Sequence, residues 1–154
     1  MTGTVSRRPP RSATAPGQRT RRAEPTRATA YRLLRAVADG AYANLELPRL
    51  LRRARLSGRD AAFTTELAFG TLRNRSFYDA VIARAADRAV TRIDDEVLDV
   101  LRLGVHQLLG MRVPDHAALD QTVGLARAVV SQGAGGFVNA VLRRVSEADR
   151  DTWL

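Results

Sequence analysis

Apolar residues recur at intervals of three and four from about residue 27 to about residue 147, the spacing that gathers them on one face of an α-helix. No stretch alternates apolar and polar residues over the length of a strand, and no internal repeat is present. The pattern therefore predicts an all-α fold, a helical bundle of about seven helices. The expected helices cover residues 27–39, 47–54, 58–73, 76–87, 95–110, 116–132 and 136–147.

Residues that start or stop helices support these limits. Gly40 is expected to end the first helix, whose inward face would hold Ala30, Leu33, Leu34 and Val37. Pro48 is expected in the first turn of the second helix, where a missing N–H does no harm. The glycine-rich residues 133–136 are interpreted as a flexible loop that leads into the last helix.

The N-terminal segment differs in composition from the rest of the chain. The net charge is +9, all 25 basic residues are arginine, and seven of them lie in residues 1–29 beside a single acidic residue. Residues 1–26 also hold four prolines and show no apolar period, so they are predicted to be a disordered tail. The part of the chain that should fold is only mildly basic.

The composition excludes several classes of site. The chain has no cysteine, which removes disulfides, thiolate metal sites and a cysteine nucleophile from these residues. His106 and His116 lack the spacing of metal ligands, and both are expected on the surface, His106 beside Asp99 and Arg102. No apolar run approaches the ~20 residues of a membrane span. A cytoplasmic protein with no metal and no membrane partner is expected.

One helix carries charges on its apolar side. Arg59, Glu66 and Arg73 recur every seven residues in the third expected helix, on the side of Phe63 and Gly70. That side should face the core, where an unpaired charge is costly. These three residues and Asn139 of the last helix are therefore predicted to form a structural polar network that joins helices, not a catalytic site.

Six segments, in this order, resemble one known family. They are A-Y-A-N-L at 41–45, G-R-D at 58–60, T-E-L and F-G-T-L-R within 65–73, L-R-L-G-V-H-Q-L-L at 101–109, V-P-D-H-A-A at 113–118 and G-F-V-N-A-V-L-R-R at 136–144. Together they resemble the NusB-like RNA-binding domain found at the N-terminus of RsmB-type (Fmu/Sun) 16S rRNA cytosine-C5 methyltransferases. The resemblance covers about residues 27–147, and residues 148–154 are expected to start a linker.

The resemblance implies a function. The chain would be the non-catalytic, rRNA-engaging domain of such an enzyme, with 16S rRNA and its own C-terminal methyltransferase domain as partners. S-adenosylmethionine would belong to that further domain, because family enzymes act through cysteines in a Rossmann-like domain and these residues contain none. Two alternatives stay open. One is a free-standing NusB-like antitermination factor that pairs with a small-subunit ribosomal protein and takes part in regulation of transcription; the other is a protein-interaction module.

The resemblance also points to RNA-binding arginines, since NusB-like domains hold RNA with an arginine-rich start. The expected RNA-binding residues lie before and along the outer face of the first helix and at the end of the last: Arg21, Arg22, Arg27, Arg32, Arg35, Arg143 and Arg144. A second set on the following helix comprises Arg49, Arg52, Arg53 and Arg55. Aromatic residues, Tyr42 among them, are assigned mostly to the core, so contacts should favour phosphates and RNA shape over base identity.

Overall fold

The structure is a computed structural model that describes residues 23–154, and within them the regular secondary structure is all helix. The prediction of an all-α bundle is thereby confirmed. The helices are α2 (Pro25–Ala38), α3 (Ala43–Arg53), α4 (Gly58–Arg73), α5 (Arg75–Ala86), the short 3₁₀ helix η2 (Val90–Arg92), α6 (Asp95–Leu109), α7 (Asp115–Val129), α8 (Gln132–Val145) and α9 (Arg150–Trp153).

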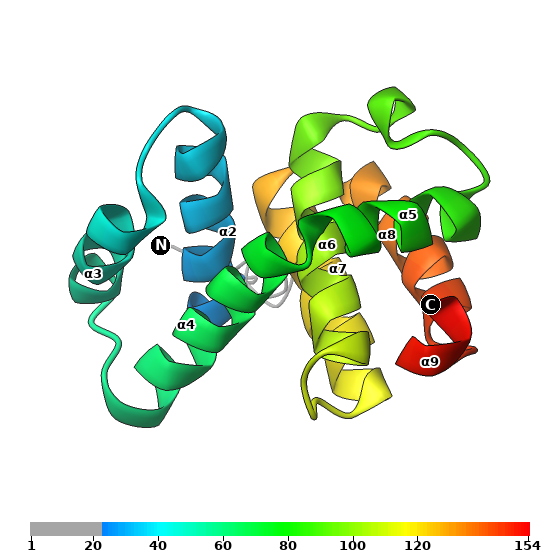
Figure 1. Cartoon of the computed structure of the whole chain (residues 1–154). Helices are drawn as coiled ribbons and strands as arrows, with labels where there is room; N and C mark the ends of the chain where they lie inside the picture. The colour runs from blue at the N-terminus through cyan, green and yellow to red at the C-terminus, as the bar shows by residue number, and fades with distance from the viewer. Residues whose placement is uncertain (1–22) are drawn as a thin grey trace, which may run out of the picture.

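Helix α6 lies at the centre of the bundle. It packs against α2, α4, α5, α7 and α8, and all of its residues from Val97 to Gln107 are buried. Figure 1 shows α2, α3 and α4 on one side of the molecule and α6, α7 and α8 grouped on the other, with α5 running across that group. A helix enclosed on every side has no solvent face, so its polar residues must find partners inside the protein.

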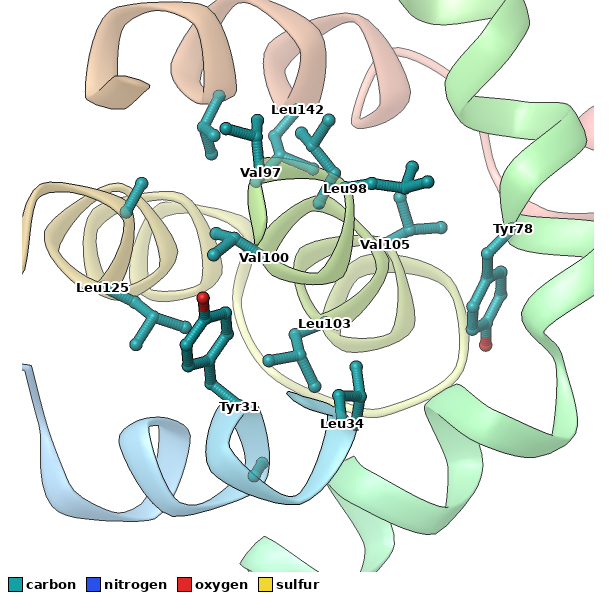
Figure 2. Packing of buried hydrophobic residues seen from close by; sticks show 14 of the residues in the cluster. Tyr31, Leu34, Tyr78, Val97, Leu98, Val100, Leu103, Val105, Leu125 and Leu142 are labelled. Atoms are coloured by element: carbon teal, nitrogen blue, oxygen red, sulfur yellow. The ribbon is translucent and has the colours of Figure 1, made fainter. Parts of the chain in front are cut away.

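The hydrophobic core joins the two groups of helices through α6. Figure 2 shows Tyr31 and Leu34 of α2 meeting Leu103 of α6, with Leu125 of α7 beside them. Leu103 is fully buried and Leu125 almost so. Each buried leucine stabilises the fold by roughly 1.5–3 kcal/mol relative to an exposed one, so this contact fixes α2 against the bundle.

Helix α2 begins earlier than the sequence pattern predicts. Glu24 caps it, because its carboxylate accepts hydrogen bonds from the backbone N–H groups of Thr26 and Arg27. Residues 25 and 26, assigned to the disordered tail, therefore belong to the helix, and Thr26 is buried. The rest of the predicted tail, residues 1–22, lies outside the described residues.

Two other helix starts also differ from the prediction. Helix α3 begins at Ala43, so Pro48 lies inside it and not in its first turn. Pro48 is exposed, and so is Asn44 four residues before it, whose carbonyl can be hydrated in place of the missing hydrogen bond. Helix α8 begins at Gln132, with Ser131 accepting a hydrogen bond from the N–H of Ala134.

The glycine-rich segment is therefore helical, which corrects its interpretation as a flexible loop. Gly135 is buried, and a Cβ at this position would lie 2.7 Å from Nε of Arg127 in α7. The missing side chain lets α7 and α8 approach closely. Composition alone suggested flexibility, whereas packing between the two helices gives this segment its helical structure.

The last residues of the chain fold back onto the domain. Asp149 caps the short helix α9, and the indole Nε1 of Trp153 donates a hydrogen bond of 3.0 Å to the carbonyl of Val145. The guanidinium of Arg150 lies 5.0 Å from the ring centre of Phe77 in α5. Residues expected to start a linker thus contact both α5 and α8. Among the helices between residues 23 and 154, none combines the length and the hydropathy needed to cross a bilayer.

Candidate nucleic-acid interface

The structure moves Arg27 from the outer face of α2 to the interior. Its Nε donates to Oε1 of Gln107 in α6 at 2.8 Å, and its Nη1 forms an ion pair with Glu24 at 2.8 Å. Its guanidinium also lies over the ring of Phe63 in α4, 5.0 Å from the centroid. Arg27 is only 9% exposed. These contacts hold the guanidinium against Gln107, Glu24 and Phe63, so Arg27 joins three helices instead of facing a phosphate.

Arg35 also forms an ion pair within the domain. Its Nη1 donates to Oδ2 of Asp99 at 2.8 Å, and this hydrogen bond raises the pKa of Arg35. The other carboxylate oxygen of Asp99 accepts from Nη1 of Arg102 at 2.9 Å. Arg102 in turn holds both oxygens of Asp79 in α5, at 2.7 and 2.9 Å. Four charges of alternating sign therefore connect α2, α6 and α5.

This network corrects the expected position of Asp99 and Arg102 at the surface. Both are buried, because the polar side of α6 is covered by α2, α4 and α5. Burial alone would lower the pKa of Arg102, but the hydrogen bonds and charges of Asp79 and Asp99 outweigh it and raise the pKa. The buried charges are thus balanced within the protein.

His106 is the third polar residue of α6 that the sequence pattern misplaced. Its side chain is 2% exposed and lies between Tyr78 and Glu66. Burial lowers the pKa of His106, and the hydrogen bond to Glu66 opposes this only in part. A neutral imidazole that meets a carboxylate at Nε2 must carry its proton there, so the Tyr78 hydroxyl donates to Nδ1 at 2.6 Å. His116, in contrast, is exposed as expected.

The predicted polar network forms only in part. Glu66 meets Arg73 at 3.6 Å, but their side chains are 48% and 62% exposed, so neither is buried as the helical phasing predicted. Glu66 does reach another helix, through Nε2 of His106 at 3.0 Å. Arg59 lies apart, at a hollow shared with Arg112, Glu24 and Asp60. Asn139 is half-buried, and within residues 23–154 no hydrogen bond of its side chain is found.

Four exposed arginines that the sequence predicts to bind RNA lie on α2 and α3. Arg32 and Arg53 line one hollow of about 370 Å³ together with Thr29, Leu50 and Ala54. Arg49 and Arg52 are exposed on the same helix as Arg53, and Glu46, 3.7 Å from Arg49, is the one acidic residue of α3. We call the group of Arg32, Arg49, Arg52 and Arg53 the α2–α3 basic surface. Within residues 23–154 only Arg49 of this group forms an ion pair, so the other three charges can meet phosphates without first breaking one in this part of the chain.

The remaining predicted RNA-binding residues do not join this surface. Arg143 and Arg144 are exposed at the end of α8, which packs on α5, α6 and α7, whereas α3 packs on α2 and α4 (Figure 1). Arg144 also donates to the carbonyl of Ala85 at 3.0 Å, at the end of α5. Arg21 and Arg22 lie outside the described residues. The structure thus separates the predicted arginines into three groups: Arg27 and Arg35, which bind other helices of the domain, the exposed cluster on α2 and α3, and the distant pair on α8.

Tyr42 is a functional candidate that the sequence reasoning assigned to the core. It is 76% exposed, and Leu45, one turn further along α3, is 70% exposed. No signal in the sequence marks Tyr42 as exposed, because the second helix is expected to begin at residue 47, and only the structure places Tyr42 directly before α3. An exposed aromatic ring beside arginines can stack on a nucleobase.

Comparison with known proteins relates this fold to RNA-associated proteins. Residues 24–147 match the NusB family. A Mycobacterium tuberculosis protein named "Putative methyltransferase" is 49% identical over 139 residues, which are 90% of this chain and 30% of that protein. The ribosomal RNA small subunit methyltransferase B of Pseudomonas putida is 39% identical over 119 residues, 77% of this chain and 27% of that protein. The chain therefore spans less than a third of the length of these relatives.

Solved structures share the fold. A chain in the crystal structure of the antitermination factors NusB and NusE in complex with dsRNA superposes with a TM-score of 0.71 at 23% identity, over 80% of this chain and 94% of that one. A chain in the crystal structure of a plectonemic RNA supercoil gives 0.72 at 23% identity, over 80% and 92%. At this level of identity the likeness concerns the architecture alone.

Proposed function

The chain belongs to the NusB family, and on that premise we propose that its helical domain engages ribosomal RNA for an S-adenosylmethionine-dependent rRNA (cytosine-C5) methyltransferase. Relatives named ribosomal RNA small subunit methyltransferase B share the domain over only part of their length, 27% in the Pseudomonas putida protein. A domain that occupies one part of such an enzyme suits the task of holding the substrate. 16S rRNA, met in the cytoplasm, is the proposed substrate.

One observation on this chain carries the proposal, namely the α2–α3 basic surface. Arginine is suited to phosphate because its planar guanidinium can donate two parallel hydrogen bonds. Arg32 and Arg53 come from different helices and line one hollow, so two guanidinium groups can approach one stretch of backbone. The arginines of residues 1–22 would add charge from outside the described domain. Affinity is then largely electrostatic and depends on salt.

We assign no catalytic step to these residues. The 154 residues contain no cysteine, whereas the resemblance implies cysteine chemistry in a separate domain. We expect titration calorimetry to detect no binding of S-adenosylmethionine to this chain. We also expect the chain to transfer no methyl group. That separate methyltransferase domain is the proposed protein partner. A role as a free-standing antitermination factor would require a small-subunit ribosomal protein instead, and the names of the relatives favour the methyltransferase.

Two charge-matched double variants test the proposed surface. Arg32→Glu/Arg53→Glu reverses both arginines of the hollow, while Arg84→Glu/Arg92→Glu reverses two exposed arginines of α5 and η2 and changes the net charge equally. We expect the first variant to weaken binding to a small-subunit rRNA hairpin by more than about tenfold, as loss of two charge-assisted contacts implies. The second variant should stay within about twofold. Equal losses would show that net charge, not this surface, holds the RNA.

A further inference from the structure

Helix α3 and the residue before it expose a row of four side chains that do not pack in the core. Tyr42, Leu45, Arg49 and Arg52 follow one another at intervals of three and four, so they share one side of the helix, and all four are exposed. We call these four residues the α3 face. At 1.5 Å per residue the row is about 15 Å long. An exposed aromatic and an exposed aliphatic side chain in line with two cations form a surface with both apolar and basic contacts.

Tyr42 is poorly suited to its position by the rules of helix stability. It is the N-cap of α3, a place that favours Ser, Thr, Asp or Asn, and its side chain makes no capping hydrogen bond. Its ring is not covered by the core either, since 76% of the residue is exposed. Neither capping nor burial therefore accounts for a large aromatic residue here.

The backbone that carries the ring is nonetheless fixed. The carbonyl of Tyr42 accepts hydrogen bonds from the N–H groups of Leu45 at 3.1 Å and Glu46 at 2.9 Å, which form the first turn of α3. The ring therefore projects from a defined point at the start of a helix. Because the backbone is already ordered, stacking of a flat partner has to order only the side-chain torsions of Tyr42.

We propose that the α3 face binds an unpaired stretch of RNA, with a nucleobase stacked on Tyr42 and the adjoining phosphates held by Arg49 and Arg52. This inference rests on the proposed function and adds the class of RNA that the domain selects. The charge supports an RNA strand as the occupant, because Glu46 is the single acidic residue of α3 and the exposed arginines leave the face positive. Leu45 provides apolar contact beside the stacked base.

The arrangement discriminates between RNA structures. In a duplex each base is already stacked between its neighbours, so Tyr42 has no free base to cover, whereas in a loop or single strand it does. Stacking of one base on an aromatic side chain changes affinity by about 5- to 150-fold. The α3 face therefore favours unpaired RNA, while Arg32 and Arg53 at their shared hollow bind phosphates of either form.

Two substitutions of Tyr42 separate stacking from folding. Tyr42→Phe keeps the ring, and Tyr42→Asn removes it while supplying a residue that caps a helix well. The full 154-residue chain and both variants are titrated with a ten-nucleotide RNA containing 2-aminopurine, alone and annealed to its complement. We expect Tyr42→Asn to lose at least fivefold in affinity for the single strand and under twofold for the duplex, with an unchanged or higher Tm. Tyr42→Phe should bind like the wild type and quench 2-aminopurine equally.

Each other outcome decides against the proposal. If Tyr42→Asn binds the single strand as tightly as the wild type, Tyr42 does not stack, even if Arg32→Glu/Arg53→Glu shows that RNA binding itself is real. If the wild type binds neither RNA, the proposed function fails together with this inference. If sedimentation shows that the wild type is a dimer and Tyr42→Asn a monomer, the α3 face is a surface for a second copy of the chain, and the RNA assignment is wrong.

Discussion

Nε2 of His106 on the central helix α6 lies 3.0 Å from the carboxylate of Glu66 on α4, while Nδ1 lies 2.6 Å from the Tyr78 hydroxyl on α5. One imidazole thus joins three helices through two hydrogen bonds of opposite polarity. It fits because Gly70 and Gly110 leave room, since a Cβ at these positions would lie 2.1 Å and 2.5 Å from its ring nitrogens. The resulting contact explains why α4 can cross α6 closely.

The stability of the domain should depend on the protonation of His106. Burial lowers the pKa of His106 below the usual 6.5, so the unfolded chain takes up this proton at a higher pH than the folded protein does. Its contribution to stability is complete above about pH 6.5 and is lost as the pH falls from there through the lowered pKa. We expect Tm to fall more steeply between about pH 7.5 and 5.5 in the wild type than in His106→Gln. His116→Gln, at an exposed site, should keep the wild-type dependence; a parallel fall in His106→Gln would contradict the assignment.

Gly70→Ala should destabilise the fold because its methyl group would overlap the imidazole. His106 is buried and hydrogen-bonded at both nitrogens, so it cannot move aside, and overpacking of this kind costs about 1–3 kcal/mol. The matched control is Gly124→Ala in α7, where a Cβ meets nothing within 4 Å. That substitution should stabilise the protein by up to about 1 kcal/mol through helix propensity. Urea unfolding of the two variants measures the contrast, and equal midpoints would refute it.

Glu66→Ala should lower the free energy of unfolding by less than the substitution of a buried, ion-paired residue would. Half of the Glu66 side chain is exposed, so the charge itself contributes little, but removing it leaves the Nε2–H of His106 without its acceptor. We expect a loss of about 1–2 kcal/mol for Glu66→Ala and under about 0.5 kcal/mol for Arg73→Ala, whose ion pair is exposed. Thermal unfolding checks both. An equal loss in the two variants would mean that the ion pair, not His106, carries the interaction.

The sequence predicts the limits of the helices better than it predicts which of their polar side chains are buried. The limits predicted for α4, residues 58–73, agree with the structure, because its apolar period is marked within the local sequence. The burial of Asp99, Arg102 and His106 could not be predicted in this way. Their spacing reads as a polar face, and only the packing of α2, α4 and α5 around α6 covers it.

At the candidate site too, the local sequence predicts the helix, but only tertiary packing decides which of its arginines are exposed. Arg27 and Arg32 are both arginines of α2, yet one binds Gln107 in the interior and the other is exposed. The periodicity of α2 placed its apolar residues correctly but could not show that its first turn lies over α4 and α6. Likewise the residue type of Tyr42 predicts a place in the core, whereas the structure leaves this side chain exposed at the start of α3.

The salt dependence of RNA binding tests most directly the claim that this domain holds RNA through the α2–α3 basic surface. If the chain reaches about four to six phosphates of single-stranded RNA, log affinity against log salt should have a slope of roughly −3 to −4, at about 0.7 per phosphate. Reversal of Arg32 and Arg53 should remove about two contacts, flatten the slope to roughly −2 and weaken binding, whereas Arg84→Glu/Arg92→Glu should keep the wild-type slope. If Arg32→Glu/Arg53→Glu keeps both the affinity and the slope of the wild type, RNA does not bind at this surface and the account is wrong.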